Sequence, residues 1–352
     1  MPGRDHGLTS EALASKAIEL GFDLCAVAPA ARHPRLARLA SWIDEGRAGD
    51  MRYLADTLDE RLDVTVMLPT ARSVVSLACV YNTAEPYSTA IDEDGRAAVA
   101  RYAWGDDYHD VLRPRLRALL RWMSDTAGPG LEALSGVDDG PVQERVFAEQ
   151  AGLGWIGKNT CLINPKLGSW LFLATIVTNA DLEPATPMVD LCGTCTRCLD
   201  ACPTGAIVEP YTVDATRCLS YLTIESRAAV DEPLRPAIRT QVFGCDICQD
   251  VCPWNRRAAV SEDPAWQPRP ELRAPRLIDL CLMSDSAWSR VLKGSAMRRA
   301  GVRRIRRSLA YAAAHLPPDD ADRAVHAMAG QPSAGHAEVA QAIAHARASV
   351  RR

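Results

Sequence analysis

Cysteine dominates the chemistry that this sequence can offer, because eight of its twelve cysteines fall in two short runs and the stretch between them. The first run, residues 192–203, reads C-x2-C-x2-C-x3-C-P, and the second, residues 245–253, repeats it without the first cysteine. Two intervening residues let a tight loop direct successive thiolates at corners of one iron–sulfur cubane. Cys218 is the only thiol between the runs that could replace the missing cysteine. The sequence therefore predicts eight thiolates that serve two 4Fe-4S clusters.

The fourth cysteine of such a run is set back by three residues and faces a second cluster. This crossing rule predicts one ligand set of Cys192, Cys195, Cys198 and Cys252, and another of Cys202, Cys218, Cys245 and Cys248. Zinc is the remaining alternative, but three cysteines in series that end in Cys-Pro are not a tetrahedral zinc pattern. Disulfides would require an oxidising compartment.

Composition places these cysteines in an ordinary globular chain of 352 residues, of which 47% are hydrophobic and 24% charged. The longest apolar runs, such as residues 171–177, are too short to cross a bilayer, and the N-terminus has no secretory pattern. We therefore expect a cytoplasmic protein. The net charge of −4 argues against general attraction to nucleic acid, yet residues 290–307 hold seven arginines, one lysine and no acid.

The elements that must position the cysteines read as mixed α and β. Apolar spacing predicts helices over residues 8–20, 34–45 and 111–123, and strands over residues 22–28 and 74–81. A further helix is expected from Pro141 to Ala151, since proline suits a first helical turn. Residues 160–164 and 170–178 read as a hairpin that turns at residues 165–168. Proline-containing linkers at 181–187 and 254–275 set off the cysteine region, and residues 277–352 read as helical.

A glycine-rich stretch, residues 152–159, contains G-x-G-x-x-G and also G-x4-G-K, with Asn159 where a phosphate-binding loop needs Ser or Thr. Both motifs require a preceding strand and a following helix, whereas the pattern here predicts the reverse. We therefore interpret the stretch as a loop that approaches a large cofactor closely.

Several further motifs resemble those of the epoxyqueuosine reductase family, which completes queuosine in tRNA with cobalamin. Together they span about residues 20–310. They are Ala100-Arg101-Tyr102-Ala103, Asp107-Tyr108-His109, Val137-Asp138-Asp139-Gly140-Pro141 with Glu144-Arg145, residues 151–160, the two cysteine runs, and residues 218–225 between them.

The resemblance implies an α+β protein with three parts. A nitroreductase-like α/β domain at residues 1–185 would hold cobalamin, with its cobalt, in place of flavin. A ferredoxin-like domain at residues 186–256 would hold two 4Fe-4S clusters, and a linker and basic helical region at residues 257–352 would contact tRNA. The implied reaction reduces the epoxide of epoxyqueuosine in the anticodon loop. The implied partners are that tRNA and an external electron donor such as a flavodoxin or ferredoxin system, acting on a monomer.

The family's proton donor maps onto Asp138, because it is the aspartate three residues before proline. An acid in this role needs a pKa raised by burial, here beside the apolar face of the corrin. The alternative is that Asp138 and Asp139 are N-caps of the helix expected at Pro141. By the residues alone, capping is the favoured interpretation of both, and Asp139 would remain the cap if Asp138 is the acid.

Corrin contacts are also carried over from the resemblance. The motif D-x-H-x-x-G, through which histidine replaces the lower cobalt ligand, is absent, so His109 is expected to be structural. The expected corrin contacts are Arg61, Arg101, Asp138, Leu162, Ser220 and Cys245, with Trp155, Lys158 and Asn159 as neighbours.

The basic run could contact tRNA phosphates through Arg298, Arg299, Arg303, Arg304, Arg306 and Arg307, or it could be a solvated face. Two rival functions are a corrinoid reductive dehalogenase and a non-enzymatic electron carrier. Dehalogenases are typically exported with a twin-arginine signal and use tyrosine as the acid, whereas a carrier would need neither an acid nor a basic surface.

Overall fold

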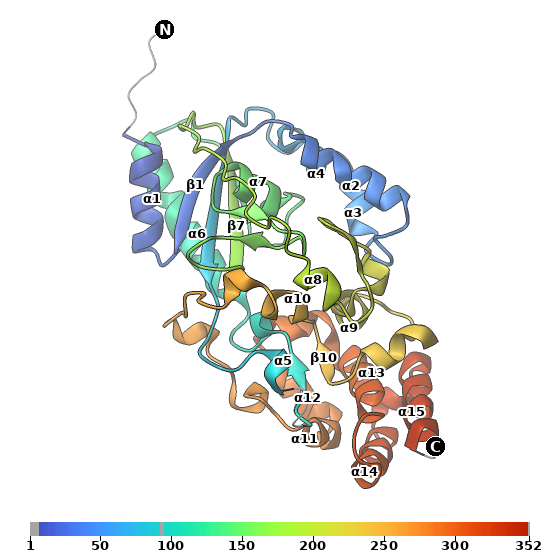
Figure 1. Ribbon diagram of the computed structural model, residues 1–352. Coiled ribbons are helices and arrows are strands. Elements are labelled where there is room, and N and C mark those ends of the chain that lie inside the picture. Colours follow the sequence, from blue (N-terminus) through green and yellow to red (C-terminus); the bar gives the residue numbers. More distant parts are fainter. Residues whose placement is uncertain (1–6, 92–94, 351–352) are drawn as a thin grey trace. The chain divides into compact units, whose positions relative to one another are not determined.

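The computed structural model describes residues 7–91 and 95–350, which form two compact units that each combine separate stretches of sequence (Figure 1). The first unit comprises Met1–Asn82, Tyr108–Cys195 and Pro253–Ser261. The second comprises Thr83–Asp107, Thr196–Cys252 and Glu262–Arg352. The predicted boundaries after residues 185 and 256 stay predictions.

A four-stranded antiparallel sheet with the order β1-β2-β7-β4 forms the centre of the first unit. Its strands are β1 (Leu24–Pro29), β2 (Ser73–Val80), β7 (Leu171–Thr178) and β4 (Ala133–Gly136). Every residue of β2 is buried, which explains its mainly apolar sequence and confirms the strand predicted there.

Helices cover this sheet because both of its faces are apolar. The core over one face joins Val146 and Phe147 of α7 (Glu144–Gln150) to Val74 and Val177 of the sheet. Figure 1 shows α1 (Ser10–Glu19) and α6 (Tyr108–Ala127) beside the sheet. The unit also contains α2 (Pro34–Asp44), α3 (Tyr53–Asp56), α4 (Leu58–Leu62) and the short pair β5 (Trp155–Ile156) and β6 (Leu162–Ile163).

Two predicted elements of this unit are wrong in detail. Residues 160–164 do not form a hairpin with β7, because β6 pairs with β5 and β7 pairs with β2 and β4. Only Asn164 and Gly168 are joined, by two N–H···O bonds across the predicted turn. The helix expected from Pro141 begins instead at Glu144, so the proline lies in the loop before it.

Helix α13 (Gly301–Ala313) is the centre of the second unit, where it packs against α9 (Leu219–Ile224), α11 (Leu277–Leu282), α12 (Asp285–Val291), α14 (Pro318–Ala329), α15 (Ala337–Val350) and β10 (Gln241–Phe243). β10 pairs in parallel with β3 (Ala98–Val99), and β8 (Ile207–Glu209) pairs with β9 (Thr212–Val213). The short helices α5 (Ser88–Ile91), α8 (Arg197–Asp200) and α10 (Ile247–Asp250) complete the unit. The predicted helical C-terminal region is confirmed for the described residues.

No helix in the described parts of the chain combines the length and the apolar character needed to cross a bilayer. The mixed α and β class predicted from the sequence is confirmed.

Candidate functional site

Asp138 lies in the loop between β4 and α7, and neither it nor Asp139 caps the helix. Gln143 occupies the N-cap position and makes no side-chain cap bond. Asp139 instead accepts a hydrogen bond from the Val137 N–H at 2.8 Å and pairs with Arg113 at 2.7 Å. The capping interpretation of both aspartates is therefore wrong, because the helix begins too late for either to reach its first free N–H groups.

Asp138 has a backbone φ of 53°, in the left-handed region that aspartate tolerates better than most residues. The Tyr108 hydroxyl donates a hydrogen bond to its carboxylate at 2.5 Å, and its own N–H donates to Glu144 Oε1 at 3.0 Å. The residue is exposed. The burial expected of a proton donor is therefore not supplied by the protein side chains around it.

Glu144 is the buried acid of this loop, and sequence reasoning assigned it no role. Burial, followed by the negative charge of Asp138, raises the pKa of its carboxyl to about 8. The residue as a whole is half-buried, and it lies next to the exposed Asp138. The signal in the sequence was the Glu144-Arg145 pair of the family motif, which by itself assigned Glu144 no role.

Arg61 of α4 is a cation on which the charges of both acids act. Burial lowers the pKa of its guanidinium, and the charges of Tyr53, Asp138 and Glu144 oppose that shift. Gln143 fixes α4 to the loop, since its side chain donates to the Arg61 carbonyl at 2.9 Å and to the Leu36 carbonyl at 3.2 Å. The fold thus brings two acids, a tyrosine and an arginine from separate segments into one group.

Aromatic rings surround Tyr108. Its ring stacks on His109 at a centroid distance of 4.1 Å and on Phe172 at 4.6 Å, and Phe172 also contacts Tyr81 at 4.3 Å. His109 therefore has a packing contact of the kind expected for a structural residue.

The glycine-rich loop is explained by packing within the protein. A Cβ at Gly154 would lie 2.2 Å from the Ile163 carbonyl oxygen, and one at Gly157 would lie 2.4 Å from the Ile163 side chain. Gly152 has a φ of +69°, and a Cβ there would lie 2.4 Å from the Thr186 carbonyl oxygen. These contacts account for the glycines without the close cofactor approach expected from the sequence.

Residues predicted as neighbours of the corrin have defined roles in this loop. Lys158 Nζ donates to the carbonyls of Gly193 at 2.7 Å and Cys195 at 3.0 Å, so it anchors the start of the first cysteine run. Trp155 and Leu162 are buried in β5 and β6, and Asn159 accepts the Cys161 N–H at 3.2 Å.

The other predicted corrin contacts, Arg101, Ser220 and Cys245, belong to the second unit. The guanidinium of Arg101 is buried and donates to Thr83, Glu85 and Pro86 at 2.8–3.0 Å. Its backbone N–H donates to Asp246 at 2.6 Å. Arg101 thus orders the segment beside Cys245, and a direct corrin contact stays a prediction.

Thiols of the second predicted ligand set influence one another. Burial raises the pKa of Cys245, and the charges of Cys218 and Cys202 add to that rise. Backbone N–H groups point at these sulfurs, including Ala206 N–H at 3.2 Å from Cys202 Sγ. Such donors suit thiolates that carry cluster charge. No three His, Cys, Asp or Glu side chains within residues 7–91 and 95–350 form a group that could hold one metal ion, so the ligand sets stay predictions.

Two known protein families match the parts of the chain that contain Asp138 and the cysteine runs. A model described as epoxyqueuosine reductase QueG matches residues 61–138, and a 4Fe-4S double cluster binding domain matches residues 191–255. The epoxyqueuosine reductase of Gloeobacter violaceus is 44% identical over 310 residues, which cover 85% of this chain and 95% of that protein. This chain belongs to the epoxyqueuosine reductase family.

Solved epoxyqueuosine reductases have the same fold. One, with an epoxyqueuosine-modified tRNA-Tyr stem loop, is 29% identical with a TM-score of 0.81 over 97% of this chain and 98% of that one. Another, from Bacillus subtilis, is 29% identical with a TM-score of 0.78 over 97% and 96%, and its aspartate catalytic loop is swung out of the active site.

Membership of the epoxyqueuosine reductase family confirms the resemblance and makes the chain an oxidoreductase of queuosine biosynthesis with a two-cluster 4Fe-4S domain. It decides against both the reductive dehalogenase and the non-enzymatic electron carrier.

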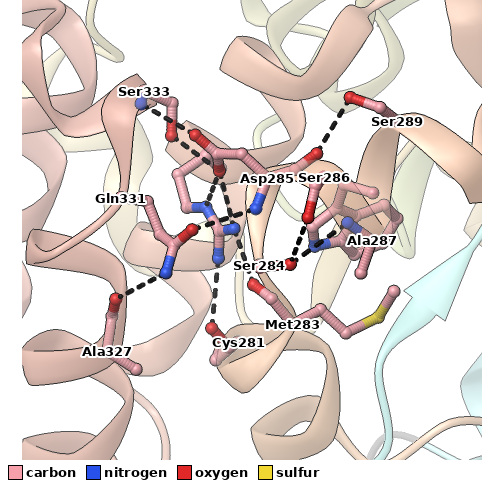
Figure 2. Close-up of polar contacts among 12 residues, drawn as sticks. Cys281, Met283, Ser284, Asp285, Ser286, Ala287, Ser289, Ala327, Gln331 and Ser333 are labelled. Carbon is pink, nitrogen blue, oxygen red and sulfur yellow. Dashed lines mark hydrogen bonds and ion pairs between the residues drawn. The ribbon is translucent and has the colours of Figure 1, made fainter.

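The basic run contains structural arginines that the RNA hypothesis had included. The side chain of Arg306 is 0% exposed and pairs with Asp285 at 2.8 Å, in the network of polar contacts around Asp285 that Figure 2 shows. Arg307 is equally buried and donates to the carbonyls of Leu222, Ser226 and Ala228. Both are wrong as RNA contacts, because neither guanidinium reaches the surface.

Arg298 and Arg299 remain available, with side chains 66% and 57% exposed. Each already has an acidic partner, Asp107 at 3.6 Å and Glu225 at 2.8 Å respectively. The acids are less exposed, at 5% for Asp107 and 23% for Glu225, so it is the arginine end of each pair that could contact a phosphate.

Proposed function

We propose that the chain reduces epoxyqueuosine to queuosine in the anticodon loop of tRNA, with cobalamin as cofactor, two 4Fe-4S clusters as electron path and Asp138 as proton donor. The observation that carries the proposal is the group of Asp138, Tyr108, Glu144 and Arg61 in a chain of this family. A structure of a relative holds an epoxyqueuosine-modified tRNA stem loop, which supports the substrate.

The reaction consumes two electrons and two protons, which convert the epoxide into an alkene and water. Bound cobalamin would supply reducing power at cobalt, delivered as single electrons through the clusters. The chain must supply a proton where the carbon–oxygen bond breaks, because an epoxide oxygen leaves poorly as an alkoxide. Asp138 is suited to this step, since its exposed carboxyl is held by Tyr108 and can reach a bound substrate.

The residues present fit a corrin in three respects. Asp138 is exposed, so a large apolar ligand above it would provide the burial that its own surroundings lack. Arg61 supplies a half-buried cation for the amide or phosphate groups of such a ligand. Aromatic rings next to Asp138 provide a rigid apolar base. Corrin contacts through Leu162, Trp155, Asn159, Lys158, Arg101, Ser220 and Cys245 remain part of the proposal.

The proposed division of labour assigns catalysis to residues 1–185, electron transfer to residues 186–256 and tRNA contact to residues 257–352. A flavodoxin or ferredoxin system would supply electrons to a monomer. A 4Fe-4S domain held by thiolates and a tRNA substrate suit the reducing cytoplasm, which we propose as the location.

Cofactor content tests this proposal directly. Protein purified without oxygen should contain about eight irons and about one corrin per chain, because eight thiolates can hold two cubane clusters. Iron and sulfide analysis and the absorption spectrum of the extracted corrin measure both. Cys218→Ser should lower iron toward about four per chain, whereas Cys281→Ser, outside both ligand sets, should leave iron unchanged. An iron-free, zinc-loaded protein after anaerobic reconstitution would contradict the proposal.

Salt dependence tests the tRNA-contacting surface. The double variant Arg298→Gln/Arg299→Gln should bind the tRNA stem loop more weakly. The slope of log affinity against log salt should also become shallower, by roughly 0.7 to 0.9 per lost phosphate contact. The matched control is Arg323→Gln on α14, whose side chain is 63% exposed and paired with Asp320. An unchanged slope in the double variant would assign this surface to solvent.

A further inference from the structure

The position of Asp138 depends on a contact that the reaction itself does not require. Its φ of 53° is reached by few residues other than glycine, so this conformation needs support from its surroundings. Two described hydrogen bonds provide that support, one from Tyr108 to the side chain and one from the backbone N–H to Glu144. The second determines where the backbone lies, and therefore where the carboxyl points.

Glu144 can accept the Asp138 N–H in either protonation state, but only its neutral form does so without repelling the Asp138 carboxylate. Its carboxyl is buried, and the charged groups that act on it are the acids Asp138 and Asp139 and the cations Arg145 and Arg61. An ionised Glu144 would place a second negative charge next to the Asp138 side chain. A neutral carboxyl still offers its carbonyl oxygen to the Asp138 N–H without that repulsion.

We propose that Glu144 is a positioning residue, which holds Asp138 in its left-handed conformation beside Tyr108 by accepting the Asp138 N–H, and that this loop opens more easily as the pH rises. The proposal rests on the proposed function only in giving Asp138 its catalytic role. The contact itself and its pH dependence are properties of the folded chain.

The sign of the pH dependence follows from the two states of the loop. In the closed state the pKa of Glu144 is about 8, whereas in an open, solvated state it returns toward the ordinary value of 4.5. The open state therefore releases a proton between these two values. The opening equilibrium should rise by up to about tenfold per pH unit from about pH 5 to about pH 8, and then level off.

Hydrogen exchange of the Asp138 amide, in holoenzyme without substrate, measures this equilibrium. The measured rate, divided by the rate of the same peptide unstructured at each pH, gives a protection factor. Wild-type protection should fall steeply between pH 5 and pH 8. In Glu144→Gln, which keeps a carbonyl acceptor but cannot ionise, protection should be nearly constant over that range. Glu144→Ala, which removes the acceptor, should lower protection at every pH, by about threefold to tenfold for one lost hydrogen bond.

Glu149→Gln is the matched control, because Glu149 lies in the same helix, is buried, and also accepts a backbone N–H, from Ile156 at 2.9 Å. It should leave the pH dependence of Asp138 protection as in wild type. The proposal is overturned if Glu144→Gln retains the wild-type slope, or if Glu144→Ala leaves Asp138 as protected as before.

Turnover then separates this proposal from the assignment of the acid. If Asp138 is the proton donor, turnover in Glu144→Ala should fall in parallel with Asp138 protection, and turnover in Glu144→Gln should vary less with pH than in wild type. If Asp138→Asn retains turnover while Glu144→Gln still abolishes the pH dependence of protection, the catalytic assignment fails and the positioning role stands.

Discussion

Replacing Asp138 with asparagine should lower turnover of epoxyqueuosine-containing tRNA by about 10²–10⁴-fold, the usual contribution of a general acid. Asparagine keeps the shape of aspartate, tolerates the left-handed conformation at φ 53°, and still accepts a hydrogen bond from Tyr108. It cannot deliver a proton to the departing oxygen. Iron content, corrin content and stem-loop affinity should therefore stay near wild type while single-turnover conversion to queuosine falls.

Asp139→Asn is the control for this experiment. Asp139 lies next to Asp138 in the same loop but is held by Arg113. Burial would raise the pKa of Asp139, but the hydrogen bonds from Arg113 and Val137 and the charge of Arg113 together outweigh it and lower that pKa. Its replacement should cost turnover less than Asp138→Asn does. Near-normal turnover in Asp138→Asn, or a large loss in Asp139→Asn alone, would show that Asp138 is not the proton donor.

Replacing Asp285 with alanine should destabilise the protein by about 3–5 kcal/mol, the usual cost of breaking a buried ion pair on one side. Arg306 has no exposed side-chain surface, so its guanidinium would lose its counter-charge without gaining water. Asp285 also accepts hydrogen bonds from the N–H and hydroxyl of Ser333, which tie the α14–α15 connection to α12 (Figure 2). Anaerobic urea unfolding of the cluster-loaded protein, followed by tryptophan fluorescence, measures the loss.

Asp320→Ala is the matched comparison, because the Asp320–Arg323 pair is largely exposed and should contribute at most about 1 kcal/mol. Equal losses from the two alanine variants would show that the Arg306 charge is solvated.

The dependence of stability on pH provides a second check of the Asp285–Arg306 pair. Burial would raise the pKa of Asp285, but the hydrogen bonds from Arg306 and Ser333 outweigh it and lower that pKa. The stabilisation should therefore be complete above the ordinary pKa of an aspartate and disappear as pH falls through the lowered value.

Several features of the chain follow from local sequence alone. The spacing of eight cysteines predicted a two-cluster domain, since thiolates that share one cubane must lie close together along a loop. The mainly apolar sequence of β2, rich in β-branched residues, predicted a central strand, because a strand covered on both faces favours such a sequence. Joint motifs around Arg101, Asp138 and the glycine-rich loop identified the family.

Other features depend on contacts between distant segments, which no local pattern contains. Arg298 and Arg306 belong to one basic run, yet the first is exposed and the second is buried, because α12 places Asp285 against α13. Asp138 and Asp139 resemble helix caps in sequence, but the helix begins at Glu144, and the contacts of Asp138 come from Tyr108 and Glu144. Burial and charge at a carboxyl are set by tertiary structure, so only the folded chain could distinguish Glu144 from its other acidic residues.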